Sequence, residues 1–202
     1  MISDYNTAKN RLLASSDREC RRFFENKGCI LELAYCNLLK DDFREAEKYF
    51  RSVYEQDLRA KWGLFLINLI QGKVQRYPTY FELRNFLEID IQILINNYKG
   101  DYVEKIVSYA DFLFTVNHEA YKFIARVFAA NDFIEQAKFF LDRGKEFFHN
   151  DPELHYLIAS ISLKEKNPGM ALQAAQTCLE ILPGYYPAVK LKKELIGVNG
   201  EQ

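Results

Sequence analysis

The sequence predicts an all-α protein made of consecutive helical hairpins. Apolar residues recur at helical spacing, strand signals are almost absent, and a polar turn followed by a helix recurs four times. These segments read DDFREAEKYF from Asp41, GDYVEKIVSY from Gly100, NDFIEQAKFF from Asn131 and KNPGMALQAA from Lys166. Ala137 and Ala171 lie 34 residues apart, and we place Lys105 at the equivalent position, 32 residues before Ala137. We therefore expect a supersecondary unit that repeats at nearly this period.

The composition is typical of a folded, helix-rich chain. Of the 202 residues, 49% are hydrophobic and 27% are charged, with nine Gly and five Pro. The formal net charge of −1 gives no general attraction to nucleic acid or to an anionic membrane. The amino terminus has no long apolar core, and no run approaches the roughly 18 apolar residues that span a bilayer. We expect a cytoplasmic protein without a membrane partner.

Residues 1–26 are predicted to form one or two amphipathic capping helices. Ser16-Asp17-Arg18-Glu19 offers a capping box before Cys20. Because the four cysteines include no CxxC pair, we expect them to be reduced and mostly buried as small hydrophobic side chains.

Residues 27–185 are predicted to hold about four to five hairpins. Asp41-Asp42 resembles a pair of catalytic carboxylates, but acidic residues that open a helix cap its free amides, and we favour capping. Residues 59–98 are irregular: Gln71-Gly72-Lys73 indicates a helix end, and Pro78 must begin a helix or break one. The stretch IDIQILI from Ile89 lies inside a helical pattern, so we expect a helix there.

Residues 186–202 are predicted to be a carboxy-terminal capping helix followed by a frayed tail. The segment from Ala188 to Ile196 follows two prolines and is long enough for one closing helix. Gly197 to Gln202 is expected to fray.

The repeated units resemble the tetratricopeptide repeat. The last unit matches best, with Ala159 as the small residue of the first helix, Ala171 and Cys178 at the two small positions of the second, and Pro183 at its end. Trp62 stands where the motif opens with an aromatic residue, whereas Lys105 replaces an expected alanine. The resemblance implies a right-handed α-α superhelix of stacked hairpins, whose first helices line a concave groove.

By this resemblance, eight first-helix residues are expected to line the groove and contact a partner. They are Leu31, Tyr35, Leu38, Lys122, Arg126, Tyr156, Ser160 and Lys164. Lys122 and Arg126 share a helix face, and with Lys164 they are suited to accept a carboxylate. An ordinary solvated face is the alternative. Some tetratricopeptide proteins bind chaperone tails through a Lys and Asn clamp, but Arg126 stands where that clamp needs Asn.

The leading functional hypothesis is a scaffold or adaptor that binds a peptide or helix of another protein in this groove. We expect no enzyme, cofactor or metal site, since GxGxxG, GxxxxGK[ST], GxSxG and HExxH are absent and no cysteine neighbours the three histidines.

Two other functions stay open. The first is a nucleic-acid-binding helical repeat, based on the basic clusters Lys9, Arg11, Arg18, Arg21 and Arg22 and Lys190, Lys192 and Lys193. The near-neutral net charge argues against it. The second is an assembly or secretion chaperone subunit, which an exposed apolar groove would favour. The sequence leaves the oligomeric state open.

Overall fold

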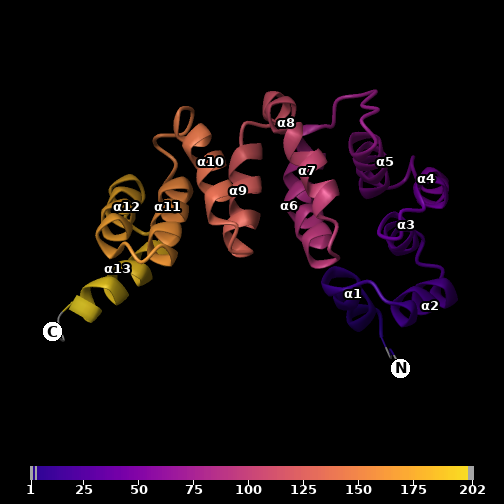
Figure 1. Ribbon diagram of the computed structural model, residues 1–202, viewed down its shortest axis with the longest axis horizontal. Helices are drawn as coiled ribbons and strands as arrows, with labels where there is room; N and C mark the ends of the chain where they lie inside the picture. The colour runs from indigo at the N-terminus through magenta and orange to yellow at the C-terminus, as the bar shows by residue number, and fades with distance from the viewer. Residues whose placement is uncertain (1, 3, 200–202) are drawn as a thin grey trace. The chain divides into compact units, whose positions relative to one another are not determined.

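The structure is a computed structural model that describes residue 2 and residues 4–199 (Figure 1). Within these residues the chain forms thirteen α-helices and no strand, which confirms the all-α prediction. The chain divides into two compact units, Met1–Ala120 and Tyr121–Gln202, here called the N-terminal and C-terminal units. No helix in the described part is long and apolar enough to cross a membrane. The predicted division into 1–26, 27–185 and 186–202 stays a prediction.

The N-terminal unit contains the first eight helices. They are α1 (Tyr5–Ala14), α2 (Arg18–Lys27), α3 (Ile30–Leu38), α4 (Phe43–Ser52), α5 (Leu58–Ile70), α6 (Tyr80–Asn96), α7 (Gly100–Ser108) and α8 (Ala110–Val116). The other five helices are α9 (Ala120–Ala130), α10 (Ile134–Lys145), α11 (Pro152–Lys164), α12 (Pro168–Ile181) and α13 (Tyr186–Asn199). The four predicted turn-and-helix segments are the starts of α4, α7, α10 and α12, so each predicted second helix is confirmed.

The caps of the early helices follow the sequence with one correction. Two helices precede the first hairpin, but the predicted Ser16 capping box is wrong. Asp17 is the cap of α2, and its carboxylate accepts the Cys20 amide at 2.6 Å, while the Ser16 amide donates to the Asn97 side chain. Asp42 caps α4 by accepting the Glu45 amide, which confirms capping as the role expected of this acid.

Four hairpin turns in the described part of the chain share one backbone geometry. Each contains a non-glycine residue in the left-handed region, which we call the turn residue: Asp41 (φ 66°), Tyr98 (59°), Asp132 (62°) and Lys166 (59°). In each, the amide after the turn residue donates to a carbonyl five residues earlier: Asp42 to Asn37, Lys99 to Leu94, Phe133 to Phe128 and Asn167 to Ser162. This is the Schellman ending of a helix, and the second helix starts two residues after the turn residue.

The turn residues fix a common register. Tyr98, Asp132 and Lys166 are 34 residues apart. Five residues after each of the four turn residues lies a buried side chain: Ala46, Val103, Ala137 and Ala171. Seven residues before them lie Ala34, Ile91, Ala125 and Ala159, all with no exposed surface. Small residues predominate at these positions because helices that cross closely leave little room for side chains.

This register corrects the predicted position of Lys105. Lys105 is exposed, and Val103 takes the place equivalent to Ala137. The 32-residue spacing assumed from the sequence was two residues short. The repeat therefore keeps a buried apolar residue here and does not need a lysine at a helix crossing.

The loop before α6 explains the irregular segment 59–98. Gly72 adopts the left-handed conformation and Lys73 closes a Schellman bond to Asn68, yet the next helix begins only at Tyr80. Arg76 holds the loop by donating to the Lys61 carbonyl at 2.7 Å. Pro78 lies just before the helix, so it precedes a helix and does not break one. The stretch IDIQILI is helical, as predicted.

Glu82 anchors the start of α6 and links its stability to pH. It is 1% exposed, accepts hydrogen bonds from Arg76 at 2.7 and 3.0 Å, and forms a capping box with Thr79. Burial raises the pKa of Glu82, but the Arg76 and Thr79 hydrogen bonds more than offset this, so its pKa lies below the ordinary 4.5. A lowered pKa in the folded state contributes stability above the unfolded-state pKa, and that contribution disappears as pH falls.

We therefore expect Glu82→Gln to flatten the acid limb of the stability curve. Between about pH 5 and pH 3, the unfolding free energy of the N-terminal unit should fall more steeply in the unaltered chain than in the variant. Urea unfolding followed by fluorescence of Trp62, the single tryptophan, measures this. Equal slopes in the two chains would contradict the role given to Glu82.

In the C-terminal unit the helices pack through aromatic and small side chains. The Tyr121 ring of α9 lies 6.0 Å from the Phe140 ring of α10. The core of α11, α12 and α13 consists of Ala159, Ala171, Ala174, Ala175, Leu191 and Leu195. The predicted closing helix is confirmed as α13. It continues to Asn199 through residues expected to fray, and residues 200–202 lie outside the described part.

The cysteines are placed as predicted. All four are free thiols. Cys20, Cys36 and Cys178 are buried and Cys29 is half-buried, so three of them fill core space as small hydrophobic side chains.

Candidate functional site

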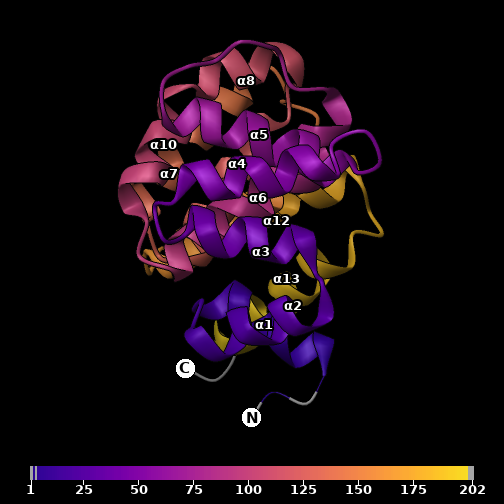
Figure 2. The same ribbon diagram turned by 90° about the vertical axis from the view of Figure 1, so that its right-hand side faces the viewer.

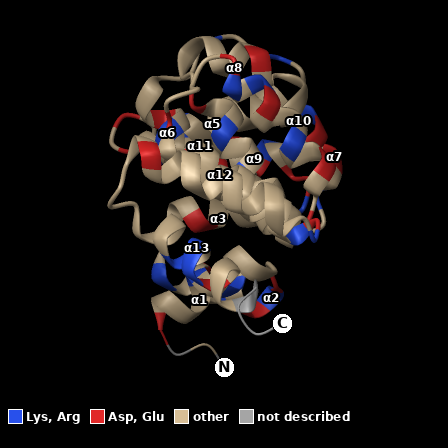
Figure 3. Ribbon diagram, turned by 90° about the vertical axis from the view of Figure 1, so that its left-hand side faces the viewer, with Lys and Arg blue, Asp and Glu red and all other residues tan. Residues whose placement is uncertain are grey.

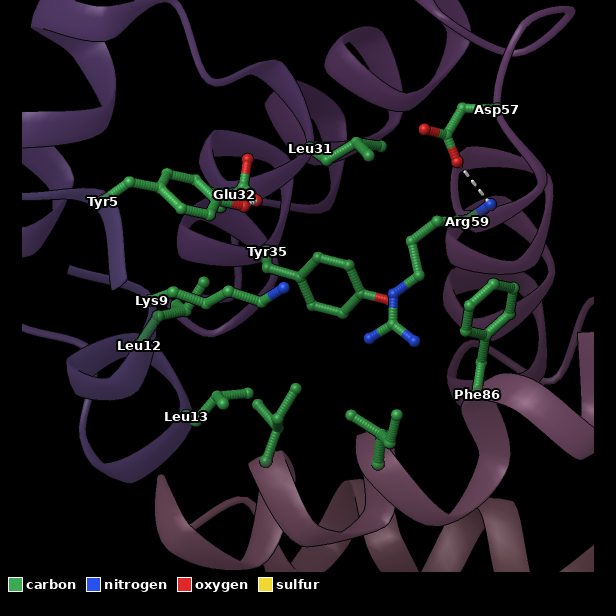
Figure 4. Close-up of a pocket in the computed structure, with 12 residues that line it drawn as sticks. Tyr5, Lys9, Leu12, Leu13, Leu31, Glu32, Tyr35, Asp57, Arg59 and Phe86 are labelled. Carbon is green, nitrogen blue, oxygen red and sulfur yellow. Dashed lines mark hydrogen bonds between the residues drawn. The ribbon is translucent and has the colours of Figure 1, made fainter. Parts of the chain in front are cut away.

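A pocket of about 570 Å³ opens in the N-terminal unit between α1, α3, α6 and the start of α5 (Figure 4). Its apolar wall consists of Leu12, Leu13, Leu31, Phe86, Ile89 and Ile93. Ile89 keeps 47% of its surface exposed, which is unusual for a large aliphatic side chain at a hollow. A volume of this size is in the range of protein binding pockets, roughly 300 to 1,000 Å³.

Arg59 forms one side of the pocket and is held rigidly. Its guanidinium lies 4.6 Å from the ring centroids of both Tyr35 and Phe86, so it is stacked between two aromatic faces (Figure 4). Its Nη2 donates to the Asp90 carboxylate. Stacking and an ion pair together leave this side chain little rotational freedom.

Asp90 lies behind the pocket and is 1% exposed. Besides Arg59, it accepts a hydrogen bond from the Tyr35 hydroxyl at 2.9 Å and one from the Trp62 indole at 2.5 Å. Burial raises the pKa of Asp90, and the three donors act in the opposite direction. Eight residues before the other turn residues lie Leu33, Ile124 and Ile158, so a carboxylate occupies an apolar position of the repeat.

The rim of the pocket is polar. The Tyr5 hydroxyl donates to Glu32, and Asp57 caps α5 by accepting the Arg59 amide at 2.7 Å. Lys9 is exposed, and its ammonium lies 5.8 Å from the Tyr5 ring centroid. An apolar wall with a polar rim can accept a hydrophobic side chain together with polar groups beside it.

The pocket offers little for catalysis. Asp90 is the buried acid nearest to it, but its oxygens already accept three donors and have almost no exposed surface. In the described part of the chain, no three His, Cys, Asp or Glu residues are grouped to hold a metal ion. The geometry is therefore one of binding.

Comparisons with family models, curated proteins and solved structures found no match to this chain.

Three of the predicted groove residues lie in the N-terminal unit. Leu31 and Tyr35 line the pocket. Leu38 has no exposed surface and packs in the core, so we remove it from the groove. It lies three residues before its turn residue, whereas Leu31 and Tyr35 lie ten and six before it and share a different face of α3.

The other five lie in the C-terminal unit, where the cations already have acidic partners. Lys122, only 5% exposed, binds Asp151 at 2.7 Å and Glu153 at 2.9 Å, and Arg126 also pairs with Glu153. Lys164 binds Asp132 and the Ala129 carbonyl, both at 2.6 Å. Lys122 and Arg126 do meet carboxylates, but those of α11, which joins neighbouring hairpins.

Tyr156 and Ser160 are half-buried on α11. Tyr156 packs against the Tyr185 ring at 5.6 Å and against the alanine-rich core of this unit. The Ser160 hydroxyl donates to the Tyr156 carbonyl at 2.9 Å. Their surfaces contribute to packing in this unit, and a role in partner binding stays a prediction.

Sequence reasoning missed the pocket residues contributed by α6 and the start of α5. Counting back from Tyr98 places Glu88, Gln92 and Asn96 in the register of Leu31 and Tyr35. The irregular segment concealed this register. Arg59 and Asp90 gave no local signal, because their partners lie 31 and 55 residues away.

The basic clusters are partly neutralised. Arg11 pairs with Asp17 and Glu19, and Arg21 pairs with Glu25. Figure 3 shows the lysines of α13 in blue beside α12, which carries almost no charge. We find no built site for phosphate in either cluster.

Proposed function

We propose that the protein is a tetratricopeptide-like repeat that holds a segment of another protein, as a scaffold or adaptor and not as an enzyme. The observation that carries the proposal is the apolar pocket on α1, α3 and α6, which leaves Ile89 half exposed beside the rigid Arg59. Exposed apolar surface in a hollow is favourable to leave only where a partner covers it.

The common register supports the repeat part of this proposal. Turn residues spaced by 34, with buried residues at fixed positions before and after them, are what stacked hairpins of one kind require. A right-handed superhelix and a cytoplasmic location belong to the same proposal.

Replacement of Ile89 by aspartate tests where the partner binds. The partner captured from cytosol by the tagged chain is purified, and its affinity is measured by calorimetry. We expect Ile89→Asp to weaken binding by at least about tenfold, near 1.4 kcal/mol, because a charge then replaces apolar surface. The matched control is Ile196→Asp on α13, where the isoleucine is 52% exposed.

Both variants should keep the near-ultraviolet circular dichroism of the unaltered chain. An equal loss of affinity in both, or no loss with Ile89→Asp, would move partner binding away from the pocket.

A further inference from the structure

The first helix lies across the first helices of two hairpins. Within the N-terminal unit, α1 contacts both α3 and α6, and it lies beside α2 (Figures 1 and 2). Two asparagines at the end of α6 hold the end of α1. The Asn96 amide donates to the Leu13 carbonyl at 2.9 Å and the Asn97 amide to the Leu12 carbonyl at 3.3 Å.

These bonds make a site for the end of a helix. The last carbonyls of a helix have no partner inside it, and here side chains of another element satisfy two of them. Asn96 lies two residues before its turn residue, on the α6 face that also carries Gln92. At the other end of α1, the Tyr5 hydroxyl donates to Glu32 of α3. The helix is thus bound at both ends by polar contacts.

Few side chains of α1 are buried. Ala8 and Leu12 are the buried residues of this ten-residue helix, whereas α3 buries six of nine. Against α2, α1 contributes the contact of Tyr5 with the Phe24 ring and a bond from the Cys20 thiol to the Ala8 carbonyl. Tyr5, Ala8 and Leu12 lie at i, i+3 and i+7, the spacing of a helix that docks in a groove.

We infer that the face of α3 and α6 accepts a short amphipathic helix, and that α1 occupies this face as an intramolecular competitor. This inference rests on the proposed function and adds its partner class and its regulation. The partner helix presents an aromatic, a small and an aliphatic residue at i, i+3 and i+7, as α1 does. Its last carbonyls take the amides of Asn96 and Asn97.

The pocket gives room for this exchange. It lies next to α1, whose residues Lys9, Leu12 and Leu13 form one side of it, while Leu31 and Ile89 continue the apolar surface beyond the helix. A longer helix can therefore bury surface that α1 leaves open. It binds in full only when α1 has left, so the apparent affinity of a partner is reduced by the fraction of chains in which α1 is docked.

A labelled peptide of residues 1–16 tests the inference on the full chain. Leu12→Asp in the chain puts a charge on the docked side of its own α1 and leaves α3 and α6 unaltered. By fluorescence anisotropy, we expect the peptide to bind this variant at least about tenfold more tightly than the unaltered chain. The control is Asn10→Asp, which adds the same charge at an exposed position of α1.

Equal affinity of the peptide for all three chains would overturn the inference. So would loss of the Trp62 near-ultraviolet signal in Leu12→Asp, because α1 would then be part of the core. Hydrogen exchange of the unaltered chain is the second measurement: amides of α1 should exchange ahead of those of α3 and α6, and simultaneous exchange would also refute it. No partner protein enters these experiments, so their failure is distinct from a failure of the proposed function.

Discussion

Replacement of Asp90 by leucine is expected to destabilise the N-terminal unit by about 3 to 5 kcal/mol, the usual loss when one member of a buried ion pair is removed. Asp90 is 1% exposed and accepts donors from Arg59, Tyr35 and Trp62. Leucine leaves all three donors without this acceptor, and the guanidinium stays between two aromatic rings. Urea unfolding followed by circular dichroism at 222 nm measures the loss.

Asp90→Asn separates the charge from the hydrogen bonds. The amide oxygen still accepts a donor, and burial already raises the pKa of Asp90, so its charge is stabilised little beyond its hydrogen bonds. We expect Asp90→Asn to cost less than Asp90→Leu, and the double variant Arg59→Met, Asp90→Leu to recover part of the loss. A leucine variant as stable as the unaltered chain would show that the Asp90 contacts contribute nothing to folding.

Gly63→Ala is expected to destabilise the same unit by about 1 to 3 kcal/mol through overpacking. A Cβ on Gly63 would lie less than 3.0 Å from three ring carbons of Phe50. The Phe50 ring has no exposed surface and packs edge-on against Tyr35 at 5.4 Å, so it cannot swing aside. Because the clash separates α4 from α5, it should also disturb Trp62 beside Gly63, which its fluorescence in urea unfolding reports.

Gly100→Ala is the matched control. Gly100 opens α7, and a Cβ there meets nothing within 4 Å. Its unfolding free energy should stay within about 0.5 kcal/mol of the unaltered chain or rise slightly, since alanine restricts the unfolded state. If both variants lost equal stability, the close approach of α4 and α5 would not be the cause.

Much of the helical pattern could be predicted from the sequence, because it depends on neighbours three and four residues away. The helices after Asp41, Gly100, Asn131 and Lys166 are local in this sense. The position of Lys105 was wrong because helix starts were aligned by the residues in the turn and not by its backbone. Only the left-handed φ of Tyr98 shows where that turn lies.

The candidate site could be predicted only in part. Leu31 and Tyr35 follow from helix periodicity, but the pocket also needs α1 and α6, which meet across more than 80 residues. Lys122 and Arg126 looked available for a partner's acid because their own partners, Asp151 and Glu153, belong to a later hairpin. A sequence gives the charge of a side chain, and the fold decides which opposite charge reaches it first.

The constant distance between Tyr98, Asp132 and Lys166 has a consequence for how such a chain changes length. A duplication or excision of any 34 consecutive residues in this stretch returns every helix to the same point of the cycle, wherever the cut falls. Crossovers therefore need no agreement with helix boundaries. A gene of this kind can gain or lose one hairpin in a single recombination event.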